Sequence, residues 1–308
     1  MATYLFTHPA CLGHDPGAGH PERPARLASV LKALSGPEFA TLQRREAPLA
    51  TTEQLARAHP PRYVDAVLEA FPKEGYVQLD GDTIISPGSK DAALRAAGAL
   101  VAATDAVMAG EASNAFCAVR PPGHHAEPMR PMGFCLFNNV VVAARHARAQ
   151  YGVRKVAVMD FDVHHGNGTE TQALADADLF YASTHQSPLY PGSGMHNHAG
   201  HPNVVNAPLP PRSGSSEFRA AMSEQVLPAM RAFAPEFVII SAGFDAHQAD
   251  PLAELKLTED DFAWATEQLL QVAREHAAGR LVSALEGGYD LDALGRSAQA
   301  HVRALMAA

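Results

Sequence analysis

Six apolar runs, each five residues long, alternate along this chain with longer segments of helical periodicity. That alternation limits the possible folds more than any other feature. Most of the runs show little polar alternation, which is typical of strands covered on both faces. Short buried strands separated by helices indicate βαβ units and a mainly parallel sheet. The predicted strands are Thr3–Thr7, Ala115–Val119, Val156–Asp160, Leu179–Ser183, Phe237–Ser241 and Leu281–Leu285.

The sequence predicts helices between these strands. In the segment 27–34, leucine and valine fall at positions i, i+3, i+4 and i+7, and Gly36 ends the pattern. Thr258 and Asp261 form a capping box before the segment Phe262–His276. No change of composition divides the chain, so we expect one α/β domain over residues 1–308. The other predicted helices are Arg62–Phe71, Ala92–Met108, Val140–Gln150 and Phe218–Phe233.

Composition and charge exclude several classes of protein. The chain carries 24 Lys and Arg against 33 Asp and Glu, and this net charge of -9 disfavours nucleic-acid binding. The longest apolar stretch, 92–108, is interrupted by two charged residues, so no membrane span is expected. Three cysteines, Cys11, Cys117 and Cys135, make no disulfide framework and favour a reducing compartment. The first residues lack the features of a signal peptide, so we expect a cytoplasmic protein.

The 16 histidines include several that directly follow predicted strands. The strand 156–160 runs into a segment that holds Asp162 and His164. Because side chains alternate along a strand, Asp160, Asp162 and His164 can share one face. Carboxylates gathered there are costly unless a charge compensates them, and a divalent metal would do so. The ordinary alternative is a polar strand end with an idle, hydrogen-bonded histidine.

Three further strands end in polar motifs: Arg120–His125, Ser241–His247 and Leu285–Tyr289. Each has an ordinary explanation when taken alone, namely solvated histidines, a helix cap and a turn. Ligands of parallel sheets bind beyond the carboxyl ends of the strands, so the four motifs together predict one site at one sheet edge. Three protein ligands beside an open position are typical of catalytic zinc.

These motifs resemble those of the zinc-dependent histone deacetylase family, which includes bacterial acetylpolyamine amidohydrolases and has the arginase/deacetylase fold. The resemblance extends from His20 to Tyr289, and its details are similar to the class II branch. It implies a single-domain α/β fold with a mainly parallel central sheet and helices on both faces. The motifs that carry it are Arg120–His125, Asp160–Gly168, Gly243–Asp245 and Glu286–Tyr289.

The resemblance also implies roles for individual residues. Zinc, or ferrous iron as an alternative, would be held by Asp162, His164 and Asp245. The implied catalytic residues are two histidine pairs and one tyrosine: His124 with Asp160, His125 with Asn167, and Tyr289. A structural potassium ion would be held at Asp160, Asp162, His164, Ser183 and Thr184.

The substrate would be an acyl-lysine side chain in a narrow tunnel. The resemblance implies that Gly133, Phe134 and Tyr190 line this tunnel, that Leu252 lies at its rim, and that Arg26 lies by a cavity behind the metal. This chain has Asn167 where other branches carry Asp, and Tyr190 where many lysine deacetylases carry Phe.

Several alternatives stay open. An arginase-type enzyme with two manganese ions is disfavoured, because Gly166 and Ala246 stand where further carboxylates would be needed. A non-catalytic acyl-binding protein is disfavoured because Tyr289 and the histidine pair are present. The partner is expected to be an acetylated protein or an acetylated small amine such as a polyamine, and Leu252 at the rim mildly favours acyl-lysine. A homo-oligomer is possible.

Overall fold

Eight strands form a central sheet in the computed structural model, which describes residues 2–308. Their order across the sheet is β2-β1-β5-β10-β9-β6-β7-β8, and every neighbouring pair is parallel. A separate antiparallel pair consists of β3 (Val77–Gln78) and β4 (Ile84–Ile85). The strands of the main sheet are β1 Ala2–Thr7, β2 Gln43–Glu46, β5 Ala112–Cys117, β6 Val156–Asp160, β7 Leu179–Gln186, β8 Val204–Leu209, β9 Phe237–Ala242 and β10 Leu281–Leu285.

All six predicted strands are present, and the mainly parallel α/β fold is confirmed. The predicted bounds of β6 and β10 agree with the structure, because both are uninterrupted apolar runs buried along their whole length. The run 115–119 is shifted, since β5 begins at Ala112 and ends at Cys117. Four strands were not predicted, namely β2 and β8 of the main sheet and the short pair β3 and β4. All four residues of β2 are exposed at the sheet edge, so they form no apolar run.

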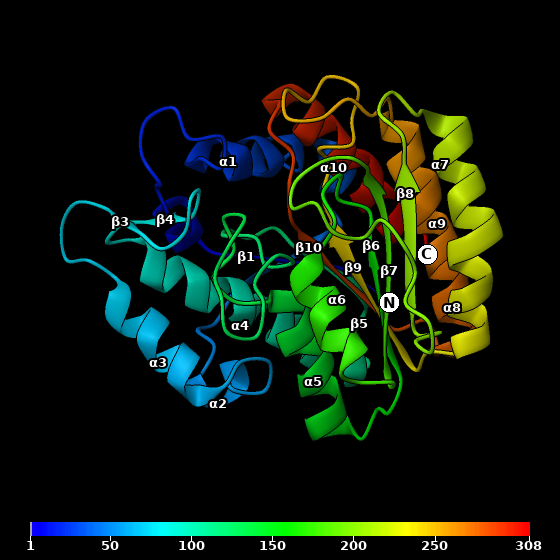
Figure 1. Ribbon diagram of the computed structural model, residues 1–308, viewed down its shortest axis with the longest axis horizontal. Coiled ribbons are helices and arrows are strands. Elements are labelled where there is room, and N and C mark those ends of the chain that lie inside the picture. Colours follow the sequence, from blue (N-terminus) through cyan, green and yellow to red (C-terminus); the bar gives the residue numbers. More distant parts are fainter. Residues whose placement is uncertain (1) are drawn as a thin grey trace.

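Helices cover both faces of the sheet (Figure 1). α4, α5 and α6 pack together on one side, and α8, α9 and α10 pack together on the other. The predicted helix 218–233 is in fact α7 and α8 joined by a π-helical turn, Met222–Val226. The helices are α1 Pro24–Ala33, α2 Thr52–Leu55, α3 Pro61–Ala70, α4 Ser89–Met108, α5 Asn139–Tyr151, α6 Asn167–Leu174, α7 Ser215–Ala221, α8 Leu227–Phe233, α9 Glu259–His276 and α10 Leu291–Met306. Of these, α2, α6 and α10 were not predicted.

The strand order determines where the site lies. The chain leaves β5, forms β6, β7 and β8 at one side, and then returns to insert β9 and β10 between β6 and β5. The four strands that precede the polar motifs, β5, β10, β9 and β6, are therefore neighbours at the centre of the sheet. Their carboxyl ends meet at one edge, as expected of a ligand site in a parallel sheet. No helix within residues 2–308 is long and apolar enough to span a membrane.

Candidate active site

A pocket of about 260 Å³ opens at the carboxyl edge of β5, β10 and β6. It contains both histidines of the 120–125 motif, His164 and Tyr289, together with apolar side chains from several loops. The structure thus brings most of the sequence-predicted site residues to one place. The lining residues are Asp82, Pro122, His124, His125, Gly133, Phe134, His164, Leu189, Tyr190, Leu252, Gly287 and Tyr289.

Asp162, His164 and Asp245 lie together at this edge of the sheet. One ligand atom from each lies within 4.8 Å of the other two, and all three residues are buried. His164 Nδ1 is 3.1 Å from Asp162 Oδ1 and 3.1 Å from Asp245 Oδ2. β6 ends at Asp160, so a turn and not strand alternation arranges these groups. In that turn the backbone N–H of His164 donates to Asp162 Oδ1 at 2.9 Å.

The residues around this cluster fit a divalent cation. Two buried carboxylates carry more negative charge than one imidazole can balance, and a divalent cation would offset the excess. Glycines leave room for the carboxylates to converge. A Cβ added to Gly243 would lie 2.0 Å from Asp162 Oδ2, and one added to Gly287 would lie 2.1 Å from Asp245 Oδ2. The backbone N–H of Gly287 also donates to Asp162 Oδ2 at 2.8 Å. Two carboxylates and one histidine form a donor set that suits zinc or ferrous iron.

His124 points its Nδ1 at Asp160 Oδ2, at 2.9 Å. The hydroxyl of Tyr181 lies 3.4 Å from the same carboxylate oxygen and accepts the backbone N–H of Gly166 at 2.9 Å. A Cβ at Gly166 would lie only 2.3 Å from Asp160 Oδ2, so a larger residue there would displace the carboxylate. Burial opposes a charge on His124, but the Asp160 and Asp162 carboxylates outweigh it and raise the pKa of His124 to about 10 in the metal-free protein.

His125 has a neutral partner. Its Nδ1 lies 2.9 Å from Asn167 Oδ1, and Asn167 Nδ2 donates in turn to Glu127 Oε1 at 2.8 Å. Burial, together with the charges of His124 and His164, lowers the pKa of His125 well below its usual value. The two adjacent imidazoles therefore differ: His124 favours the protonated form and His125 the neutral form.

Tyr289 lies on a loop that is held from two sides. Arg26 is fully buried, donates to the carbonyls of Gly288 at 2.6 Å and Glu286 at 2.5 Å, and has its guanidinium carbon 4.8 Å from the centre of the Tyr289 ring. On the other side, Asp250 Oδ2 accepts the backbone N–H of Tyr289 at 2.7 Å. Burial raises the pKa of Tyr289 well above its usual value, so its hydroxyl stays protonated and able to donate.

The carboxylate of Glu286 links this loop to the histidine loop. Its Oε2 accepts the backbone N–H of Gly123 at 2.7 Å and that of His124 at 3.2 Å, and its Oε1 accepts from the Ser241 hydroxyl at 3.1 Å. Glu286 is 1 % exposed, and this burial raises its pKa to about 7. Three of the four motif loops are therefore joined by one side chain.

The pocket walls combine apolar side chains with one carboxylate. Gly133 and Phe134 both adopt positive φ, 57° and 68°, which turns the chain sharply beside His125. Asp82 Oδ1 accepts the backbone N–H of Gly133 at 3.2 Å. Tyr190 lies opposite, with its ring centre 5.3 Å from that of His125, and is 40 % exposed. Leu252, at 37 % exposure, also lines the pocket.

Sequence reasoning missed four residues of this site. Glu127 lies two positions after His125, just beyond the motif Arg120–His125, so its nearness to that motif was a usable signal. Asp82, Tyr181 and Asp250 belong to no recognisable motif. They reach the site only through tertiary contacts, which no local pattern could reveal.

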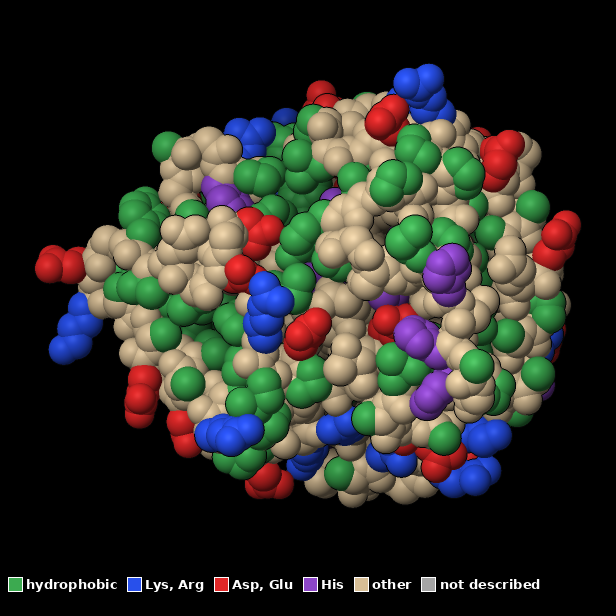
Figure 2. Space-filling model, in the orientation of Figure 1, with side chains coloured by type: hydrophobic (Ala, Val, Ile, Leu, Met, Phe, Trp, Pro, Cys, Tyr) green, Lys and Arg blue, Asp and Glu red, His purple; other side chains and the backbone are tan. Residues whose placement is uncertain are grey.

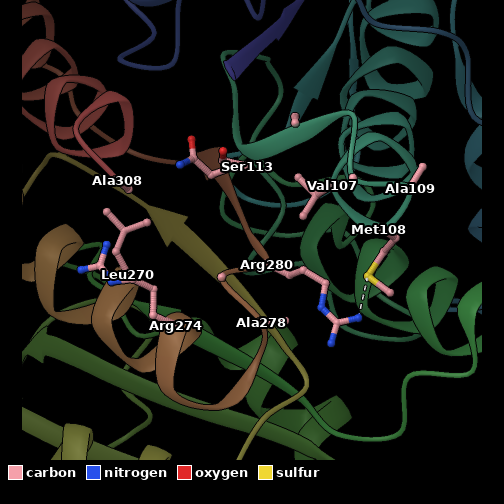
Figure 3. A pocket seen from close by; sticks show the side chains of 13 residues that line it. Val107, Met108, Ala109, Ser113, Leu270, Arg274, Ala278, Arg280 and Ala308 are labelled. Carbon is pink, nitrogen blue, oxygen red and sulfur yellow. Dashed lines mark hydrogen bonds between the residues drawn. The ribbon is translucent and has the colours of Figure 1, made fainter. Parts of the chain in front are cut away.

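Other candidate sites lack comparable features. Several histidine side chains gather on one part of the surface that Figure 2 shows. Among the contacts of the described residues, His198 Nε2 lies 3.1 Å from Glu170 Oε1. Within residues 2–308, however, the Asp162 cluster is the one group of three that could hold a metal. A pocket of about 480 Å³ lies where β5 and β10 begin (Figure 3). Its arginines, Arg274 and Arg280, lie on different sides, and Arg280 points toward the sulfur of Met108 at 3.9 Å.

Comparisons with known proteins agree with this geometry. The histone deacetylase domain model matches residues 20–305. A histone deacetylase-like amidohydrolase of Pseudomonas aeruginosa is 42% identical, over 91% of this chain and 74% of that protein. A probable deacetylase of Archaeoglobus fulgidus is 38% identical, over 95% of this chain and 82% of that protein. The crystal structure of the HDA15 HD domain superimposes with a TM-score of 0.93 at 34% identity, over 99% of this chain and 88% of that one.

Proposed function

This chain belongs to the histone deacetylase family of deacetylases and amidohydrolases, and we propose that it is a zinc-dependent hydrolase of acyl-lysine side chains. It would remove acetyl or other short acyl groups. The observation that carries this proposal is the Asp162, His164 and Asp245 cluster, which lies beside two histidines with different partners at the floor of a narrow pocket.

The metal cluster and the two histidines beside it would each have a role in amide hydrolysis. A metal held by Asp162, His164 and Asp245 would polarise the substrate carbonyl and lower the pKa of the attacking water. His125, neutral and with Nε2 available, would take a proton from that water and later deliver it to the leaving amine. His124, held by Asp160, would add positive charge beside the developing oxyanion.

Tyr289 would donate its hydroxyl proton in a hydrogen bond to the same oxyanion. One such donor is typically worth about 3–4 kcal/mol in the transition state. Support from Arg26 on one side and Asp250 on the other would hold the loop in place before substrate binds, which would reduce the reorganisation that the reaction requires. The carbonyl of Gly133 would accept the substrate N–H and set its orientation.

The pocket walls favour an extended aliphatic chain. Phe134 and Tyr190 would pack against the methylene groups of a lysine side chain, with Leu252 at the rim. An acetylated small amine is the second candidate. It is favoured by the Asp82 carboxylate in the pocket lining, which suits a distal cationic nitrogen.

Further parts of the proposal concern the protein as a whole. We propose that residues 1–308 form one catalytic domain. A potassium ion at Asp160, the backbone of Asp162 and His164, Ser183 and the backbone of Thr184 would be structural. A cytoplasmic location and a homo-oligomer stay predictions.

The experiment that tests the proposal is a deacylation screen of the zinc-loaded protein. Acetyl-lysine peptides, acetylated polyamines and lysine peptides with longer acyl chains are compared at equal concentration. We expect the highest kcat/KM on acetyl-lysine or short-acyl-lysine peptides. Higher kcat/KM on acetylated polyamines would favour the second candidate, and no hydrolysis of any acylamide would contradict both.

A further inference from the structure

Three side chains form a hydrogen-bonded row that begins at the pocket-lining His125, continues through Asn167 and ends at the partly exposed Glu127. His125 Nδ1 lies 2.9 Å from Asn167 Oδ1, and Asn167 Nδ2 lies 2.8 Å from Glu127 Oε1. Asn167 Nδ2 also lies 3.3 Å from the sulfur of Met132. The amide of Asn167 thus has acceptors on its nitrogen side and an imidazole nitrogen on its oxygen side.

The chemistry of these groups fixes the direction of every bond. An ionised carboxylate and a thioether sulfur can only accept hydrogen bonds, so the NH₂ group of Asn167 must face Glu127 and Met132. The amide oxygen must then face His125. Since that oxygen can only accept, the Nδ1 of His125 must carry a proton, which leaves Nε2 as the acceptor in the neutral ring.

We propose that Glu127 is a positioning residue that selects, through Asn167, the Nδ1-protonated tautomer of His125. This inference rests on the proposed function, in which Nε2 of His125 takes a proton from water. If the amide turned over, its NH₂ would face His125 and favour the opposite tautomer. Nε2 would then already hold a proton and would have no lone pair with which to take a proton from water.

The backbone holds Glu127 where this task requires it. The N–H of Glu127 donates to the carbonyl of Arg130 at 3.0 Å, and the N–H of Ala126 donates to the carbonyl of Gly123 at 3.0 Å. A Cβ at Gly168 would lie 2.3 Å from the Ala126 carbonyl oxygen, so the start of α6 packs directly on this segment. Met132 alone is a weak acceptor and would hold the amide less firmly than a carboxylate.

The first test follows the tautomer of His125 directly. Long-range ¹⁵N–¹H correlation spectra of ¹⁵N-histidine-labelled protein distinguish the two tautomers, and the His125 signals are assigned by their loss in H125Q. We expect Nδ1-protonated His125 in the wild type and in E127Q, whose amide oxygen can still accept from Asn167. In E127A we expect a mixture or the Nε2-protonated form. An unchanged tautomer in E127A would overturn the proposal.

Kinetics on an acetyl-lysine peptide provide the second readout. E127A should lower kcat about tenfold with little change in KM, which is less than the 10²–10⁴-fold cost of removing a general base. E127Q should recover most of this loss. E254A is the matched control, because it removes an exposed carboxylate two residues from Leu252 without a contact to Asn167. An equal loss in E254A would show a general charge effect and contradict the proposal.

If E127A does not fold, a second comparison, between N167D and the E127Q/N167D double variant, tests the same proposal. N167D would place two carboxylates where Asn167 and Glu127 now lie 2.8 Å apart, so their repulsion should disrupt the row. The E127Q/N167D double variant replaces that repulsion with an amide–carboxylate hydrogen bond and should be several-fold more active than N167D. Equal activities would overturn the proposal. If no protein hydrolyses any acylamide while the tautomer shifts as expected, the proposed function fails and the positioning role of Glu127 stands.

Discussion

Replacing Gly287 by alanine should weaken metal binding although every ligand residue is kept, because the new side chain would displace two of the ligands. The new Cβ would lie 2.1 Å from Asp245 Oδ2 and 2.6 Å from Asp162 Oδ2, although real Cβ contacts are essentially never shorter than 3.0 Å. Relief of the closer contact needs a movement of about 1 Å. Metal–ligand distances tolerate only about 0.2 Å. We therefore expect zinc affinity to fall at least 10–100-fold, which corresponds to about 1.4–2.7 kcal/mol.

The assay is a competition between the metal-free protein and a chromophoric chelator for zinc. Circular dichroism and thermal unfolding show whether the variant is folded, because overpacking alone costs about 1–3 kcal/mol. Gly81→Ala is the matched control, since a Cβ there meets no atom within 4 Å. A folded Gly287→Ala protein with wild-type zinc affinity, or an equal loss in Gly81→Ala, would refute the reasoning.

Three further predictions follow, two for residues of the site and one for a buried histidine of α10. Tyr289→Phe should lower kcat about 10²–10³-fold with KM nearly unchanged, as for loss of a transition-state donor; steady-state kinetics in which only KM rises would make Tyr289 a binding residue. His125→Ala should reduce kcat more than His124→Ala, because the neutral ring supplies the base, and the opposite order would contradict that assignment. Burial lowers the pKa of His301 to about 3, so the unfolded chain takes up a proton there near pH 6.5 while the folded chain does not. The free energy of unfolding therefore decreases as pH falls below 6.5. Between pH 6.5 and 4, urea unfolding should show a decrease that is about 3 kcal/mol smaller in His301→Gln than in the wild type. An equal decrease in both proteins would show that His301 contributes nothing.

The fold was predictable where burial leaves a strong local pattern. β6 and β10 are buried along their whole length, and their apolar runs mark their bounds. β2 left no such pattern, because its four residues are exposed and three of them are charged. The joint between α7 and α8 did leave a signal, because Pro228 lacks an N–H and disfavours an uninterrupted helix; in the structure a π-helical turn, Met222–Val226, precedes α8, which has Pro228 in its first turn.

The site was predictable as far as strand ends determine it. The motifs after β5, β6, β9 and β10 converge because those four strands are neighbours, and the parallel-sheet rule anticipates such convergence. What the sequence could not show is how each group is supported. Asp250 lies 39 residues before the Tyr289 backbone N–H that it accepts, and Tyr181 lies 21 residues after Asp160. Contacts of this kind depend on the packed structure and not on local periodicity.

The measurement that tests the central claim most directly is acetate release from an acetyl-lysine peptide before and after zinc removal. We expect activity to disappear when a chelator strips the protein, to return in proportion to about one equivalent of added zinc, and to stay absent in Asp245→Ala at the same zinc concentration. Full hydrolysis by the chelator-treated protein, or by Asp245→Ala without bound metal, would contradict the account.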